Sequence, residues 1–153
     1  MCENVVSYYS GLDASALGGA ALKNALHALV SPHTVVSYAD AWNALATLDA
    51  DPSDATKIIG IYSNHRHDAV AARGVSTGWN REHSWPKSYG VDYSGPDFSD
   101  LHALYAADWN VNSARGNLYF DDCPLSAGCS QPAHAEAAPS TAKDSVRFQP
   151  PAD

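Results

Sequence analysis

The stretch from Trp79 to Ser88 constrains the fold more than any other part of the sequence. In an extended strand the side chains alternate between two faces, so His83 would lie with Trp79 on one face and Glu82 on the other. A carboxylate and an imidazole that act together must therefore lie at a strand end or at a bulge, where the alternation relaxes. Pro86 supplies such an end. The pattern predicts a short strand that finishes near Glu82 and His83.

Two amphipathic helices are predicted ahead of this strand. Residues 15–30 carry leucines at helical spacing, and a Ser-Pro pair follows them. The second helix is predicted over 37–48, where Ser37 and Asp40 form a capping-box pattern. Turn residues then lead into a β-branched run over 57–63, which predicts a strand.

The order predicted after Trp79 is strand, loop, strand and helix. Residues 86–99 are rich in Gly, Pro, Ser and Tyr and predict a loop, and residues 100–105 predict a second strand. Asp108 is placed to cap the N-terminus of a helix that stops at Gly116. The tail, 118–153, shows no periodicity, so we expect it to be irregular and poorly ordered.

We expect one α+β domain over residues 1–153, because a chain with 45% hydrophobic and 17% charged residues can bury a core. Its expected parts are a helical scaffold (1–56), a central part with the strands and the capped helix (57–117), and the tail (118–153). The N-terminus carries no basic, apolar leader, and no apolar run reaches the roughly 18 residues of a membrane span. We expect a soluble monomer with no membrane partner.

The net charge of −8 argues against binding nucleic acid over a broad surface, since phosphate contacts draw their affinity from Lys and Arg. The cations are nevertheless concentrated in the middle third of the chain. They are Arg66, Arg73, Arg81, Lys87 and Arg115. A basic groove on an acidic body is therefore compatible with the sequence.

The cysteines leave two alternatives open. Cys2 stands alone, whereas Cys123 and Cys129 are close enough in sequence to close a small disulfide loop, or to remain as two reduced thiols. His65 and His67 have a spacing that suits a metal ion, but their polar surroundings favour an exposed loop. A zinc or thiol module built from these four side chains ranks last among the readings.

Three segments together resemble the endonuclease I family, whose members are non-specific, metal-dependent nucleases with a ββα-metal (His-Me finger) site. They are Trp79-Asn-Arg-Glu-His-Ser-Trp-Pro-Lys-Ser88, Asp100-Leu-His-Ala-Leu104 and Val111-Asn-Ser-Ala-Arg-Gly-Asn117. The N-terminal run also looks like that family's leading helices. The resemblance implies an α+β fold with a ββα-metal finger, and hydrolysis of DNA, and also of RNA, with little sequence preference.

The resemblance also implies the roles of three residues. His83 matches the general base, and Glu82 and Asn112 match the protein ligands of a catalytic Mg²⁺ or of another hard divalent cation such as Mn²⁺ or Ca²⁺. The chemistry is consistent, because an imidazole titrates near neutral pH and a carboxylate and an amide oxygen are hard ligands.

Further side chains near these three have two alternative readings. Arg115, Arg81 and Lys87 either contact phosphates or are solvated surface charges, and phosphate contact is favoured, most of all for Arg115. Trp79 and Trp85 are expected to pack in the core rather than stack on bases. A structural role is expected for Asp100 and His102, which belong to the Asp-Leu-His run.

Two departures from the family support a competing hypothesis. The usual second histidine and Arg-Pro after Asp-Leu-His are replaced here by Ala103, Tyr105 and Ala106, and the usual C-terminal helical segment is missing after Phe148. The chain could then be a truncated, inactive relative that binds metal or nucleic acid. Family members are commonly secreted, although the residues themselves do not reveal a compartment.

Overall fold

The computed structural model describes residues 4–13 and 15–152, in two compact units, Met1–Thr34 and Val35–Asp153. The first unit contains helices α1 (Val5–Tyr8) and α2 (Gly19–Val30). Helix α2 begins later than predicted, because Gly18 is extended and Gly19 has a positive φ of 50°. The prediction of one domain over the whole chain stays a prediction, and Cys2 lies outside the described residues. No helix in the described ranges is long and apolar enough to cross a membrane.

The second unit opens with helix α3 and a small antiparallel sheet. The elements are α3 (Ala41–Leu48), β1 (Ala50–Asp51), β2 (Asp54–Ile59) and β3 (Arg66–Asp68), with sheet order β1-β2-β3. Ser37 and Asp40 pair as predicted, since the Ser37 hydroxyl donates to Asp40 Oδ2 at 2.6 Å and accepts from the Asp40 amide at 3.0 Å. The helix predicted over 37–48 nevertheless begins later, at Ala41, with Asp40 as its N-cap residue. The strand predicted over 57–63 ends earlier, at Ile59, because the chain turns at Gly60, whose amide donates to the His65 carbonyl at 3.0 Å.

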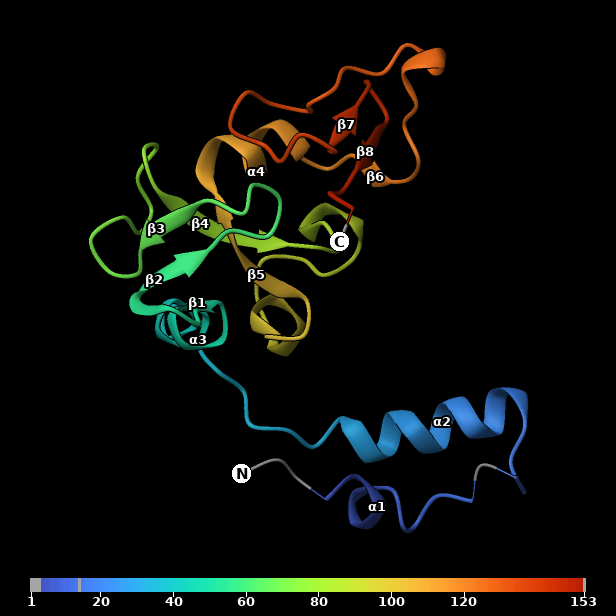
Figure 1. The fold of residues 1–153 in the computed structure, drawn as a ribbon. Coiled ribbons are helices and arrows are strands. Elements are labelled where there is room, and N and C mark those ends of the chain that lie inside the picture. The colour runs from blue at the N-terminus through green and yellow to red at the C-terminus, as the bar shows by residue number, and fades with distance from the viewer. Residues whose placement is uncertain (1–3, 14, 153) are drawn as a thin grey trace. The chain divides into compact units, whose positions relative to one another are not determined.

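Two antiparallel strands and a helix form the centre of this unit (Figure 1). Strand β4 (Trp79–His83) pairs with β5 (Leu104–Asp108), and α4 (Trp109–Arg115) follows β5 directly. Asp108 caps α4 as predicted, with Oδ1 accepting from the amides of Asn110 at 2.9 Å and of Val111 at 3.0 Å. The helix ends at Gly116, at a positive φ of 55°, as the sequence predicts.

The prediction of a second strand over 100–105 is wrong at its start. Asp100 and the next residues form a turn, in which Asp100 Oδ1 accepts from the His102 amide at 2.9 Å and the Ala103 amide donates to the Asp100 carbonyl at 3.1 Å. The loop predicted over 86–99 contains two short 3₁₀ helices, η1 (Lys87–Tyr89) and η2 (Pro96–Ser99).

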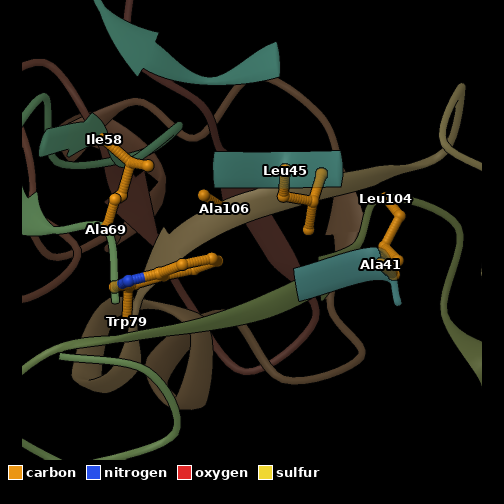
Figure 2. Packing of buried hydrophobic residues seen from close by; sticks show 7 residues of the cluster. All are labelled: Ala41, Leu45, Ile58, Ala69, Trp79, Leu104 and Ala106. Atoms are coloured by element: carbon orange, nitrogen blue, oxygen red, sulfur yellow. The ribbon is translucent and has the colours of Figure 1, made fainter. Parts of the chain in front are cut away.

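The main hydrophobic core lies between α3, the first sheet and the β4-β5 pair. Figure 2 shows its buried members, which are Ala41, Leu45, Ile58, Ala69, Trp79, Leu104 and Ala106. Trp79 is fully buried as predicted, and its Nε1 donates to the Asp68 carbonyl at 3.1 Å. The prediction for Trp85 is wrong, because its side chain lies beyond the end of β4, is 60% exposed, and donates to the Tyr89 carbonyl. The core thus packs against one face of β4 and holds the strand in place.

The C-terminal segment is more ordered than the predicted irregular tail. It forms η3 (Leu125–Ala127) and a third sheet of β6 (Tyr119–Phe120), β7 (Ala142–Lys143) and β8 (Arg147–Gln149), in the order β6-β8-β7. Figure 1 shows this sheet in orange to red, on the same side of the unit as α4. Phe148 is fully buried in a second cluster with Tyr62 and Val111. Strands of two or three residues are too short to show alternation in the sequence.

A disulfide bond joins Cys123 to Cys129. This finding decides between the two alternatives that the sequence left open. It also shows that a zinc or thiol module with these cysteines is wrong, since each sulfur is bonded to the other. The bridge closes the loop after β6 on itself and lies in a small buried cluster with Ala142 of β7.

Removing the bridge is expected to destabilise the protein. The double variant Cys123→Ala/Cys129→Ala should lose about 2 kcal/mol of unfolding free energy, because a short covalent loop restricts the unfolded chain. Thermal denaturation of the wild type with and without a reductant gives the matched comparison. Reductant should lower the Tm of the wild type and leave that of the variant unchanged; equal Tm values for all samples would contradict the prediction.

Candidate active site

A cleft of ≈ 390 Å³ lies at the junction of β4 and α4. All six residues that the sequence singled out line it, namely Arg81, Glu82, His83, Lys87, Asn112 and Arg115. The other lining residues are Tyr38, Trp42, Asn80, Pro86, Trp109, Ser113, Gly116 and Asn117. Residues from a strand, a 3₁₀ turn and a helix thus converge on one concave surface.

Glu82 is a buried carboxylate with two fixed partners. Its side chain is 4% exposed, and Oε1 accepts from the Tyr62 hydroxyl at 2.7 Å and forms an ion pair with Arg115 Nη1 at 3.0 Å. Burial raises the pKa of Glu82 to about 7, while Arg115 and the Tyr62 hydroxyl act in the opposite direction. Arg115 and Tyr62 therefore only partly offset the cost of burying the ionised carboxylate, and a bound cation would stabilise it further.

Arg115 connects Glu82 to the end of β4. The guanidinium is 2% exposed, and it donates from Nη1 to the His83 carbonyl at 3.0 Å and from Nη2 to the Ser84 carbonyl at 2.8 Å. It also lies over the ring of Phe120, at 4.5 Å from the centroid. Its donors are directed at the protein, which favours a positioning role over the predicted phosphate contact.

The tautomer of His83 follows from its hydrogen bond. Nε2 lies 2.8 Å from the Phe98 carbonyl oxygen, which can only accept, so Nε2 carries the proton and Nδ1 keeps its lone pair. The imidazole stacks on the Phe98 ring at 5.1 Å. Burial lowers the pKa of His83, and the charges of Lys87 and Arg81 lower it further. The side chain is therefore a neutral imidazole near neutral pH.

Asn112 reaches the cleft from the second turn of α4. Its amide nitrogen donates to Asn80 Oδ1 of β4 at 2.6 Å, so its oxygen is the atom that remains for a cation. Glu82 and Asn112 therefore offer one carboxylate and one amide oxygen in the same cleft. These hard donors fit Mg²⁺, Mn²⁺ or Ca²⁺.

Two further cations border the cleft. Arg81 lies over the rings of Tyr38 at 3.5 Å and Trp42 at 4.2 Å, and Lys87 Nζ lies 4.9 Å from the Tyr93 ring. With Arg115 they make the cleft locally basic on a chain of net charge −8. The other arginines of the middle third lie elsewhere, with Arg66 paired to Asp51 and Arg73 donating to Asn43 Oδ1 at 2.9 Å.

Three contributors to the site were missed from the sequence. The sequence pattern places Tyr62 in a predicted strand and gives it no role at the site, although its hydroxyl donates to Glu82 Oε1. Asn80 accepts a hydrogen bond from the Asn112 side chain. Its place in the Trp79–Ser88 stretch, on the same strand face as Glu82, is a signal that could have predicted its place in the site. Phe98 contributes its backbone carbonyl, for which side-chain patterns offer no signal.

Three histidines of the central part lie away from these residues. The His102 side chain is 98% exposed and is paired with Asp100, and the structural role expected for it stays a prediction. His65 and His67 do not line the cleft. The exposed loop expected for them is wrong for His67, which lies on β3 with a side chain only 12% exposed.

Comparison with known proteins gives a family and two relatives. The sequence model of the endonuclease I family matches residues 18–153. An extracellular ribonuclease of Bacillus amyloliquefaciens is 45% identical over 119 residues, and an extracellular ribonuclease of Bacillus subtilis (strain 168) is 42% identical over 119 residues. Each match covers 76% of this chain and 40% of the relative, so the chain spans less than half of the length of these proteins. No solved structure gives a significant match.

Proposed function

Because the chain belongs to the endonuclease I family, we propose that it is a divalent-cation-dependent endonuclease with a ββα-metal (His-Me finger) site. It hydrolyses phosphodiester bonds of DNA and RNA with little sequence preference. The observation that carries the proposal is the convergence of a neutral histidine, a carboxylate and an amide oxygen in one basic cleft. RNA as a substrate is supported by the two relatives, which are named ribonucleases.

His83 is the general base of this proposal. With Nε2 donating to the Phe98 carbonyl, Nδ1 accepts a proton from a water molecule, and the resulting hydroxide attacks phosphorus. The bond from phosphorus to the leaving oxygen then breaks, and that oxygen takes up a proton. The products are a phosphomonoester and an alcohol, so one water is consumed for each bond cleaved.

Glu82 and Asn112 hold the cation through their oxygens. A bound Mg²⁺ would neutralise the charge that develops on the phosphate and would make it easier to protonate the leaving oxygen. Arg115 keeps the Glu82 carboxylate and the end of β4 in position through its contacts with Glu82 Oε1 and the His83 carbonyl. Arg81 and Lys87 are the proposed phosphate contacts.

A nuclease assay on the 153-residue chain tests the proposal. We expect DNA and RNA to be degraded in Mg²⁺ and to be left intact when a chelator is present. Cleavage that persists in chelator would contradict a cation-dependent mechanism. Binding of nucleic acid without any cleavage would support the competing hypothesis of an inactive relative.

Asn112→Ala should weaken the response to Mg²⁺. We expect the Mg²⁺ concentration at half-maximal rate to rise by about tenfold or more, since a cation ligand is lost. Ser113→Ala is the matched control, because Ser113 lies on the same helix and lines the same cleft but its hydroxyl donates to the Trp109 carbonyl at 2.8 Å. Equal Mg²⁺ titrations for the two variants would remove Asn112 from the cation site.

The pH dependence should report His83. The base works only when neutral, so activity is present above its pKa and is lost as the pH falls through it, below the usual 6.5. Lys87→Met removes a charge that lowers this pKa, so the acidic limb of the pH–rate profile should move to higher pH. The assay uses saturating Mg²⁺, so that protonation of Glu82 does not contribute. An unmoved limb would show that Lys87 does not act on the base.

We also propose that the protein is secreted. Both relatives are named extracellular ribonucleases, and the disulfide between Cys123 and Cys129 suits an oxidising compartment. The monomeric state stays a prediction.

A further inference from the structure

A second group of potential metal ligands lies outside the residues of the cleft. His65, His67 and Asp108 bring two imidazole nitrogens and one carboxylate oxygen within 4.8 Å of one another. The proposed nuclease mechanism uses none of the three. The zinc reading of the sequence paired these histidines with cysteines, and the structure places Asp108 beside them instead.

The backbone fixes the three side chains relative to one another. His67 lies on β3 opposite Ile58 of β2, and His65 precedes β3 by one residue, so the two imidazoles can share a face. The turn between β2 and β3 packs closely on the Asp108 backbone, since a Cβ added at Gly60 would lie 3.1 Å from the Asp108 amide nitrogen. The sequence Gly60–His65 thereby directs both histidines to the junction of β5 and α4.

The two oxygens of Asp108 have different roles. Oδ1 accepts the two amide hydrogen bonds that cap α4. Oδ2 lies 3.3 Å from His67 Nε2 and 3.9 Å from His65 Nδ1. The cap therefore holds the carboxylate in one orientation, with the second oxygen directed at the imidazoles.

The distances match those of a zinc site. When each ligand atom is about 2.1 Å from a tetrahedral Zn²⁺, neighbouring ligand atoms are about 3.4 Å apart. The Asp108–His67 separation of 3.3 Å already has this value, and the separation of 3.9 Å to His65 needs a small rotation of a side chain that is 49% exposed. His67 Nε2 is moreover buried, and at 3.3 Å from Asp108 Oδ2 it faces that oxygen without the geometry of a good hydrogen bond. A cation bound by both atoms would satisfy the two together.

We propose that His65, His67 and Asp108 bind one Zn²⁺, with water completing the coordination. Two nitrogen donors select zinc over Mg²⁺, which prefers oxygen ligands, so this site differs in chemistry from the pair Glu82 and Asn112. The ion joins β3 to the N-terminus of α4, the helix that carries Asn112 into the cleft. It is a structural site, and its existence does not depend on the proposed nuclease activity.

Zinc binding to the untagged chain tests the proposal. After treatment with chelator, the protein is titrated with Zn²⁺ in excess Mg²⁺ by calorimetry, and its Tm is measured with and without Zn²⁺. We expect one Zn²⁺ per chain and a higher Tm. In His67→Ala and His65→Ala the affinity should fall by more than the roughly 10–100-fold that loss of an outer-shell partner costs. Asp108→Asn keeps an oxygen for the helix cap and should weaken binding as well.

Two controls separate this site from other binding. His102→Ala removes a histidine that is 98% exposed and lies outside the cluster, so it should bind Zn²⁺ as the wild type does. Glu82→Gln should also bind normally, even if nuclease activity is lost. Absence of stoichiometric binding in the wild type would overturn the proposal. So would unchanged binding in the His65→Ala variant, whose half-exposed side chain can be removed without unfolding the chain, or binding lost only in Glu82→Gln.

Discussion

Nuclease activity should fall by about 10²–10⁴-fold when His83 is replaced by alanine, which is the usual contribution of a positioned general base. The imidazole is a neutral side chain of the cleft that can take up a proton, and its own proton is fixed on Nε2 by the Phe98 carbonyl. The initial rate of plasmid and RNA cleavage at saturating Mg²⁺ measures the effect. Full activity in this variant would exclude His83 as the base.

Two comparisons separate loss of the general base from loss of structure. His83→Gln keeps an N–H donor for the Phe98 carbonyl while removing the base, so it should be as inactive as His83→Ala and closer to the wild type in Tm. His102→Ala is the matched histidine control, because its side chain is 98% exposed and is paired only with Asp100 among the contacts described. It should retain wild-type rates. Mg²⁺ binding should survive in all three variants, since none removes a proposed ligand.

Replacing Arg115 with methionine should produce the largest loss of stability. Methionine fills much of the same volume but leaves the Glu82 carboxylate buried without its ion pair, and it removes the donors to the His83 and Ser84 carbonyls. Loss of one partner of a buried pair typically costs about 3–5 kcal/mol. Urea denaturation of the cation-free protein measures the change in unfolding free energy.

The pairing can be isolated with a second substitution. Arg115→Met/Glu82→Gln removes both charges of the pair, so it should recover part of the stability that Arg115→Met loses. Lys57→Met is the control for an exposed pair, since the side chains of Lys57 and Asp68 are 37% and 42% exposed, and it should have only a small effect. If Arg115 served only to contact phosphate, Arg115→Met would raise KM and leave the unfolding free energy unchanged.

The helical parts of the site were predictable because their signals are local. Asp108 caps the start of α4 and Gly116 ends it, and both residues lie directly next to the helix in the sequence. The two ends of α4 were therefore predictable. The end of β4 was predictable from Pro86, and the residues around Glu82 and His83 line one cleft in the structure.

The missed parts depend on contacts that the sequence does not display. Asp100 looks like the start of a strand, but its side chain accepts from the His102 amide and forms a turn. Strands β6 and β8 pair across many intervening residues, and Phe148 is buried through that pairing. The meeting of His67 with Asp108 joins two different sheets, so no spacing in the sequence could reveal it.

The hydrogen bond from His83 to the Phe98 carbonyl has a consequence for how the chain tolerates mutation. Every amino acid carries the same carbonyl, so no single substitution at position 98 can delete the group that sets the tautomer of the base. Substitutions at position 98 would change the packing of the ring against His83 but would leave the carbonyl in place, so mutagenesis of that side chain would not reveal its role. The orientation of His83 therefore depends on the path of the backbone at position 98 and not on which side chain that position carries.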